Sequence, residues 1–343
     1  MNASHNHGAF SKNPLVTIAV PTRNRATLLH DCLASALAQT YPNIEVLVSD
    51  NASTDATLET LKSFNDPRLR VLTNAENIGL IGNWNKCVRE AAGEYFIIVS
   101  DDNILAPTFV EKCIRLLQAE PGLPIIAGSY DIVMTAENRT VPAVLSKRLQ
   151  TGIWDGTEIL SEHLRGNFAC ATLSVAMRTD ILRRNGGFPS KHIDAGEELV
   201  WGQIFLEGRA GLINECCASY LFHTHPTPRY SYAMNIDTKF KDLCEVMDEL
   251  SNAADRMITN ASVRRKVQKL TRTYVAHRAI QELAFGRRQG ASLTEVLRHM
   301  WSWRGLLAGC TLGDFVTTSR FRLVGRILMP TPVIRLVRSM GAR

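Results

Sequence analysis

The sequence predicts an α/β protein with an open, mostly parallel sheet flanked by helices and a helical, basic C-terminal extension. Three observations support this fold class. Short apolar segments alternate with helix-like segments in the first third of the chain, polar clusters follow three of the apolar segments, and the pattern beyond about residue 238 is helical and basic. Such alternation is typical of parallel sheets covered by helices.

The first strand is expected at 15–20, where an apolar segment ends at Pro21, as buried parallel strands often do. The next segment has helical spacing, with Leu29, Cys32 and Leu33 on one side. Further strands are expected at 44–48, 69–72, 95–99, near 125–126 and at 218–222, and helices at 26–38, 56–64, 81–92, 108–118 and from near Glu197.

Composition is that of a folded globular chain, with 45% hydrophobic and 21% charged residues. The eight cysteines contain no C-x-x-C pair, which favours a reducing cytosol over a disulfide framework. Because the sequence has no run of 18 apolar residues and no N-terminal signal pattern, we expect a cytoplasmic protein without a membrane span. Residues 1–13 are polar and aperiodic, and we expect a disordered leader there.

Charge is distributed unevenly along the chain. Residues 261–343 contain 16 Lys or Arg and three acidic residues, a net charge of +13, whereas residues 1–260 contain 23 basic and 30 acidic residues, a net charge of −7. In the C-terminal part, apolar residues such as Leu323 share helical stretches with Arg322 and Arg326. This pattern suits an anionic membrane surface, and equally a helical bundle packed on the rest of the protein.

Two polar clusters end predicted strands and carry most of the acidic side chains expected at one sheet edge. The cluster 100–103 contains Asp101 and Asp102, whose hard oxygens suit Mg²⁺ or Mn²⁺, although an acidic turn that caps the helix near Thr108 is the alternative. The cluster 50–55 offers acceptors for a ligand, or forms an Asx turn with Asp55 as a helix cap.

Five motifs stand in order along the first part of the chain: VTIAVPTRNR at 16–25, QTYPNIEV at 39–46, DNASTD at 50–55, NIG at 77–79, and SDDN at 100–103 followed by Pro107. Their order and spacing resemble glycosyltransferase family 2, an inverting family with the GT-A fold. The resemblance covers roughly residues 14–110 and extends more loosely to about 230.

The resemblance implies positions for the nucleotide-sugar donor and the metal ion. Donor-binding residues would be Pro21, Thr22, Arg23, Arg25, Asp50, Asn77, Gly79, Asn83, Ser100 and Asp101. Asp50 would face the base. Asp102 is expected to be the principal ligand of Mg²⁺ or Mn²⁺ and Asp101 the second, because Ser100 stands where the family has the first acid of Asp-x-Asp. His223, where the family often has Arg, is a further candidate for the metal or diphosphate.

Inverting transfer requires a base that takes the proton of the acceptor hydroxyl. The family's acidic pair aligns with Glu197 and Glu198, which favours Glu198, a position where most members carry Asp. Asp194 and Glu197 are competitors. All three could instead be acids favoured by the helix dipole. Trp154, Phe168 and Trp201 are expected in the core rather than stacked on a sugar.

The resemblance divides the chain into a donor half at 14–105, an acceptor half at 106–235 and the basic extension at 236–343. The expected reaction moves a sugar from a nucleotide diphosphate, with UDP favoured, to a sugar or lipid-linked acceptor in the assembly of surface polysaccharide or glycolipid. The alternative is a non-catalytic protein that binds nucleotide sugars or nucleic acid. We expect no nucleic-acid partner, because the arginines alternate with aliphatic residues and no aromatic RNA-binding motif is present.

Overall fold

The computed structural model describes residues 11, 13–222, 236–288, 292–305 and 307. The chain forms two compact units, residues 1–225 and residues 226–343. Most of the expected N-terminal leader, His223 and the basic tail beyond residue 307 lie outside the described residues.

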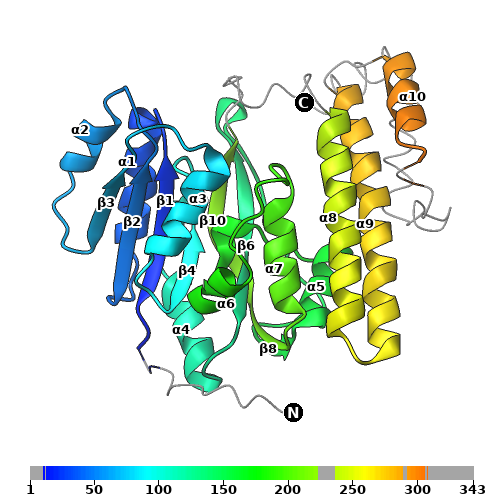
Figure 1. Cartoon of the computed structure of the whole chain (residues 1–343), viewed down its shortest axis with the longest axis horizontal. Coiled ribbons are helices and arrows are strands. Elements are labelled where there is room, and N and C mark those ends of the chain that lie inside the picture. The colour runs from blue at the N-terminus through cyan, green and yellow to red at the C-terminus, as the bar shows by residue number, and fades with distance from the viewer. Residues whose placement is uncertain (1–10, 12, 223–235, 289–291, 306, 308–343) are drawn as a thin grey trace. The chain divides into compact units, whose positions relative to one another are not determined.

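The N-terminal strands of the first unit run parallel and lie in the order β3-β2-β1-β4 across the sheet (Figure 1). Its strands are β1 (Val16–Thr22), β2 (Ile44–Asp50), β3 (Leu69–Thr73) and β4 (Tyr95–Ile98). Every residue of β1 and β2 is buried, as expected for central strands covered on both faces. Thr22 and Asp50 are partners in the register, so the two strands end side by side.

The same sheet continues beyond β4 through β9, β6, β10 and β5, while β7 pairs with β6 and β8 with β10. These strands are β5 (Ile104–Leu105), β6 (Ile125–Met134), β7 (Arg139–Val141), β8 (Gly152–Asp155), β9 (Val175–Arg178) and β10 (Arg209–Phe222). The longest ladders, including β6 with β10, are parallel, and the antiparallel pairings are short. The predicted open, mostly parallel sheet is therefore confirmed.

Strands β6 and β10 are much longer than the sequence pattern predicted. The register of β10 against β6 shifts between Ile213 and Cys216 and again between Cys216 and Ala218. An irregularity of this kind interrupts the alternation of inward and outward side chains. The apolar period of β10 is therefore broken, and only the segment after Cys217 looked like a strand.

Helices cover both faces of the sheet. Alternate residues of β1, namely Val16, Ile18 and Val20, pack in one core with Leu33 and Phe109. These two belong to α1 (Ala26–Leu37) and α4 (Phe109–Ala119), whereas α3 (Leu80–Glu90), α6 (Thr179–Arg184) and α7 (Gly196–Phe205) pass in front of the sheet in Figure 1. Because helices exclude solvent from both faces of the sheet, polar side chains gather at the carboxyl ends of the strands.

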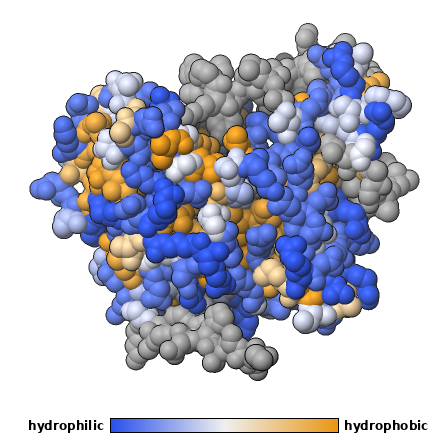
Figure 2. Space-filling view, in the orientation of Figure 1, coloured by the Kyte–Doolittle hydropathy of each residue, from blue (hydrophilic) through white to orange (hydrophobic). Residues whose placement is uncertain are grey.

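At the outer edge of the sheet, β3 and α2 (Thr57–Lys62) form an apolar depression. It is lined by Leu58, Leu61, Phe64, Leu69 and Val71 among others. Figure 2 shows orange side chains gathered over this part of the surface. The depression lies between a helix and an edge strand, and the acidic cluster at 100–103 does not line it.

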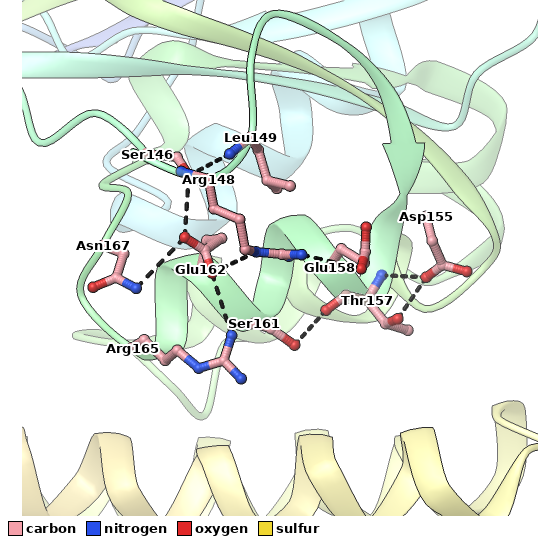
Figure 3. Close-up of polar contacts among 10 residues, drawn as sticks. All are labelled: Ser146, Arg148, Leu149, Asp155, Thr157, Glu158, Ser161, Glu162, Arg165 and Asn167. Atoms are coloured by element: carbon pink, nitrogen blue, oxygen red, sulfur yellow. Dashed lines mark hydrogen bonds and ion pairs between the residues drawn. The ribbon is translucent and has the colours of Figure 1, made fainter.

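A buried carboxylate ties α5 (Gly156–Leu164) to the segment before β8 (Figure 3). Glu162 is 2% exposed and accepts hydrogen bonds from Ser146 Oγ at 3.0 Å, Arg148 Nε at 3.3 Å and Arg165 Nη1 at 3.2 Å. Asn167 Nδ2 approaches at 3.5 Å. The charge of Glu162 is thus fully paired, which makes this cluster a brace for an otherwise irregular segment.

The second unit is helical as far as it is described, in agreement with the predicted helical extension. It contains α8 (Ile236–Met257), α9 (Ala261–Arg288) and α10 (Leu293–Ser302). Helices α8 and α9 pack on each other, and Phe240 stacks on Trp303 with ring centroids 4.1 Å apart. Among the described helices, none combines the length and apolarity needed to cross a bilayer.

Candidate active site

Three polar loops meet at the carboxyl ends of strands β1, β2 and β4. Asn51 N donates to Thr22 O at 2.9 Å, which joins the loops that follow β1 and β2. Asn24 N donates to Ser53 Oγ at 2.9 Å, and Thr54 N donates to Asn24 Oδ1 at 2.8 Å. Asn24 has φ 54°, a left-handed conformation that asparagine tolerates better than most residues. The local turn chemistry therefore holds the first two predicted clusters together.

Arg25 joins the third cluster to this edge. Its Nε lies 3.8 Å from Asp101 Oδ1 and its Nη2 lies 4.0 Å from Asp102 Oδ2. The sequence places Arg25 among the donor-binding residues, and that role stays a prediction. In the structure its guanidinium group also lies within 4.0 Å of both expected metal ligands, where it offsets part of their negative charge.

The two aspartates differ in surroundings. Asp101 is 8% exposed, and burial together with the neighbouring Asp102 raises the pKa of Asp101 to about 6 despite the opposing charge of Arg25. Asp102 is half-buried. The N-cap residue of α4 is Thr108, and no side chain forms a capping hydrogen bond there. The structure therefore does not support the alternative in which Asp101 and Asp102 form an acidic turn that caps this helix.

Residues on either side of the acidic pair hold its loop. Cys32 Sγ donates to Ser100 O at 3.4 Å from the buried side of α1. Asn103 is 1% exposed, its N donates to Ser100 O at 3.0 Å, and its Oδ1 accepts from Leu221 N at 3.0 Å. Asn103 therefore links the loop to the end of β10.

The loop after β2 is built around buried amides. Asp50 is fully buried and accepts hydrogen bonds from the hydroxyl and the backbone N of Ser53. Asn51 Oδ1 accepts from Ile78 N at 2.9 Å and from Asn74 Nδ2 at 3.0 Å, while Asn51 Nδ2 donates to Asn77 Oδ1 at 2.7 Å. This asparagine fixes the turn that leads into α3.

Asn83 and Gly79 lie in the same network. Asn83 is 3% exposed; its Oδ1 accepts from Ser49 Oγ at 2.7 Å and its Nδ2 donates to Ser49 O at 2.8 Å, so it links α3 to the end of β2. Gly79 begins α3 with φ 78°, a conformation that glycine adopts without strain. Asp55 accepts hydrogen bonds from Thr57 N at 3.0 Å and from Ala26 N at 3.3 Å, but the N-cap residue of α2 is Ala56 and not Asp55 as expected.

Arg23 provides a cationic donor beside these loops. Its Nε is buried and has no hydrogen-bond partner among the described residues. A buried N–H group is costly to leave unpaired, so this donor suits an anionic ligand at the sheet edge. Pro21 and Thr22, the last residues of β1, are buried below it, and Ser100 is half-buried.

The candidate bases lie at the start of α7. Only three residues lie between the end of this helix and the start of β10, so the helix runs back along the sheet and its first turn lies toward the carboxyl end of β10. Asp194 is exposed and precedes the N-cap residue Ala195. Glu197 accepts a hydrogen bond from the Thr172 hydroxyl. Burial raises the pKa of Glu197 to about 7, and repulsion from Glu198 adds to the shift while Thr172 opposes it.

Aromatic and sulfur side chains on α7 and on the segment 163–170 are buried together. Phe168 and Trp201 are each 1% exposed and belong to the core, as predicted, whereas Trp154 is half-buried. His163 packs edge-on against Trp201, with ring centroids 4.8 Å apart, and lies 3.6 Å from Cys170 Sγ.

Three further polar residues matter here and escaped the sequence reasoning. Asn74 bridges Asn51 and Asn83, Lys86 Nζ donates to Asn74 Oδ1 at 2.5 Å, and Thr172 holds Glu197. Each lies outside the quoted motifs, and each becomes recognisable only through a contact with a residue that is distant in sequence.

Comparisons with known proteins agree with the fold and with the family resemblance. The model of Glycosyl transferase family 2 matches residues 17–179. The chain is 30% identical over 241 residues, 69% of this chain and 86% of the relative, to the Escherichia coli UDP-Glc:alpha-D-GlcNAc-diphosphoundecaprenol beta-1,3-glucosyltransferase WfgD. It is 36% identical over 246 residues to the chondroitin synthase of Pasteurella multocida, of which it spans 23%.

A solved structure shares the architecture. The crystal structure of S. aureus TarS 1–349 in complex with UDP-GlcNAc superposes with a TM-score of 0.63 at 20% identity, over 88% of this chain and 80% of that one. At this identity the likeness concerns the fold, and it confirms the predicted GT-A type of sheet.

Fold and family match together define a glycosyltransferase of the GT-A type. The chain belongs to Glycosyl transferase family 2, as its family match and its coverage of WfgD show. These relatives favour an enzyme that uses a nucleotide sugar over the alternative of a non-catalytic binding protein.

Proposed function

We propose that this protein transfers a hexosyl group from a UDP-sugar to a hydroxyl group of a lipid-linked sugar, with inversion at the transferred sugar. The main support is the meeting of Arg25, Asp101 and Asp102 with the Asp50 loop at one sheet edge. The activity for which WfgD is named, a transfer from UDP-Glc to a diphosphoundecaprenol-linked sugar, supports this donor and acceptor class. Residues 14–105 are the proposed donor half and 106–235 the acceptor half.

The acidic pair fits a divalent cation. Asp101 and Asp102 offer hard oxygen ligands, and Arg25 already brings positive charge to both carboxylates. No group of three or more His, Cys, Asp or Glu side chains suited to a metal occurs in the described part of the chain, so donor diphosphate oxygens and water would complete the shell. Mg²⁺ or Mn²⁺ bound there would neutralise charge on the leaving diphosphate. His223 remains a candidate outside the described residues.

Glu198 is the proposed base, with Glu197 and Asp194 as the competing candidates. The carboxyl group of Glu197 is engaged by the Thr172 hydroxyl, which favours a supporting role for that residue. A carboxylate at Glu198 would take the proton of the acceptor hydroxyl as that oxygen attacks the sugar.

A cytoplasmic location at the inner face of the membrane follows from a lipid-linked acceptor. The net charge of +13 in residues 261–343 would attract this part of the chain to anionic lipid. Such attraction weakens as salt screens it.

The test measures UDP release by purified protein from UDP-glucose and UDP-N-acetylglucosamine, with Mn²⁺, and with or without a diphospholipid-linked monosaccharide. We expect acceptor-dependent release with one donor, and a higher melting temperature with UDP and Mn²⁺ together. Loss of release in Asp102→Asn but not in Asp31→Asn, whose side chain is 82% exposed, would support the site. UDP binding without acceptor-dependent release from any donor would refute the enzymatic proposal.

A further inference from the structure

Helix α10 presents an apolar face that is not needed to hold the helix in its unit. Leu297, Met300 and Trp301 are 51%, 45% and 69% exposed. Their spacing of three and four residues places them on one side of the helix. Arg304 continues this side one turn later, and its guanidinium carbon lies 4.3 Å from the centre of the Trp301 ring.

The opposite side of α10 fastens it to α8. Asp237 accepts hydrogen bonds from Trp303 Nε1 at 2.7 Å and Ser302 Oγ at 3.2 Å, and His299 Nδ1 lies 2.9 Å from the same oxygen. Trp303 is 1% exposed and stacks on Phe240. The helix is therefore anchored through one side, and the burial of the other side is left to a partner outside the described chain.

Charge around this face selects the kind of partner. Arg298 and Arg304 are both exposed. The nearby acid, Glu295, is engaged in the capping box, where Ser292 N donates to its carboxylate at 2.6 Å. A tryptophan beside exposed aliphatic side chains and arginines matches the interface of a bilayer, where the ring and the aliphatic groups leave water and the guanidinium groups remain near phosphates.

We propose that the face of α10 formed by Leu297, Met300, Trp301 and Arg304 inserts into the interface of a membrane that contains anionic phospholipid. This inference rests on the proposed membrane location and gives it a defined surface. It does not depend on the transfer reaction. Nucleic acid could bind the arginines, but Leu297 and Met300 would then stay exposed to water. A lipid interface would bury these two side chains as well as bind the arginines, so we favour lipid as the partner.

The experiment compares the full chain with the double variant Leu297→Ser/Trp301→Ser in sedimentation with phosphatidylglycerol–phosphatidylcholine vesicles. We expect the variant to partition at least about tenfold more weakly, above all at high salt, where attraction of the basic tail is screened and apolar insertion remains. The matched control is Val144→Ser/Leu145→Ser, which removes two apolar side chains exposed by 44% and 41% in the first unit and should sediment as the parent does.

Tryptophan emission supplies a second measurement. The emission of the parent protein should shift to shorter wavelength on vesicle addition, and Trp301→Phe should lose most of that shift. Equal sedimentation of the double variant and the parent, with an unchanged spectrum, would overturn the proposal, as would Trp301-dependent binding to RNA homopolymer without vesicle binding. UDP release measured in parallel separates these outcomes from a failure of the proposed enzymatic function.

Discussion

Glu162 and Asp101 are both buried carboxylates of the first unit, but their surroundings differ. Glu162 accepts hydrogen bonds at 3.0, 3.2 and 3.3 Å from a hydroxyl and two guanidinium groups. Asp101 faces a second carboxylate, and the guanidinium nitrogen of Arg25 stands 3.8 Å away. The first arrangement is complete without a ligand. The arrangement around Asp101 places two carboxylates side by side, and binding of a metal cation would stabilise their negative charge.

The pair Glu197 and Glu198 resembles Asp101 and Asp102 in this respect. In both pairs adjacent acids repel each other and burial raises a pKa, to about 7 for Glu197 and about 6 for Asp101. Functional sites often retain such unfavourable charge because chemistry requires it. Neutralising these acids should therefore lower activity without lowering stability, and neutralising Glu162 should do the reverse.

The largest expected effect is on the proposed base. Glu198→Gln should lower kcat by about 10²–10⁴-fold because general-base catalysis is typically of that size. The affinity for UDP should hardly change, since the base acts on the acceptor hydroxyl. Steady-state kinetics and UDP titration measure both quantities, with Glu137→Gln, whose side chain is 50% exposed, as the matched control. Normal turnover of Glu198→Gln together with an inactive Glu197→Gln or Asp194→Asn would assign the base to a neighbour.

Asp102→Asn tests the other acidic pair. We expect turnover to fall by about 10²–10³-fold, because a metal ion held less tightly neutralises the leaving diphosphate less well. The melting temperature in the absence of ligand should not fall, since repulsion between Asp101 and Asp102 is relieved. Mn²⁺ titration of the UDP complex should show weaker metal binding. A variant that keeps full activity in excess chelator would contradict the metal role.

Glu162→Gln should produce the opposite result. It removes the charge that Arg148 and Arg165 share, and we expect the free energy of unfolding to fall by about 1–2 kcal/mol, a value discounted because both arginines are partly exposed. Chemical denaturation gives this quantity. Glu158→Gln is the matched control in the same brace, because Glu158 is more exposed and contacts only Arg148 among the residues drawn in Figure 3. Equal stability of the parent and Glu162→Gln would show that the brace contributes little.

The smallest expected effect concerns pH. Because the pKa of Glu197 is raised from 4.5 to about 7, the folded protein binds this proton more tightly than the unfolded chain, so the contribution of Glu197 to stability falls as pH rises from about 4.5 to 7. Glu197→Gln removes that loss and should be more stable than the parent at pH 8, by about 1 kcal/mol, with a smaller or opposite difference at pH 5. Thermal unfolding of the parent and of Glu197→Gln at pH 5 and pH 8 measures this difference in stability. A parent that gains stability over the variant between pH 5 and 8 would reverse the sign and contradict a raised pKa.

The sequence by itself determined the repeating strand–helix units, the burial of β1 and β2, and the polar loops that follow them. These features follow from local patterns, because apolar periodicity and turn residues act within a few neighbours. The motifs around Asp50 and Asp101 could be predicted from the sequence because they too depend on local patterns. The loops that carry them begin where short apolar segments end.

Only the tertiary structure decided the position of Arg25 on the acidic pair, the contact of Thr172 with Glu197, the brace of Glu162 and the two sides of α10. Each depends on groups brought together by strand order or helix packing, and partners such as Thr172 and Glu197 are 25 residues apart. The length of β10 was decided in the same way, because its pairing with β6, β5 and β8 stabilises residues whose apolar alternation is interrupted. Long-range pairing overrides local pattern in these places, since burial and charge depend on neighbours in space and not on neighbours in the chain.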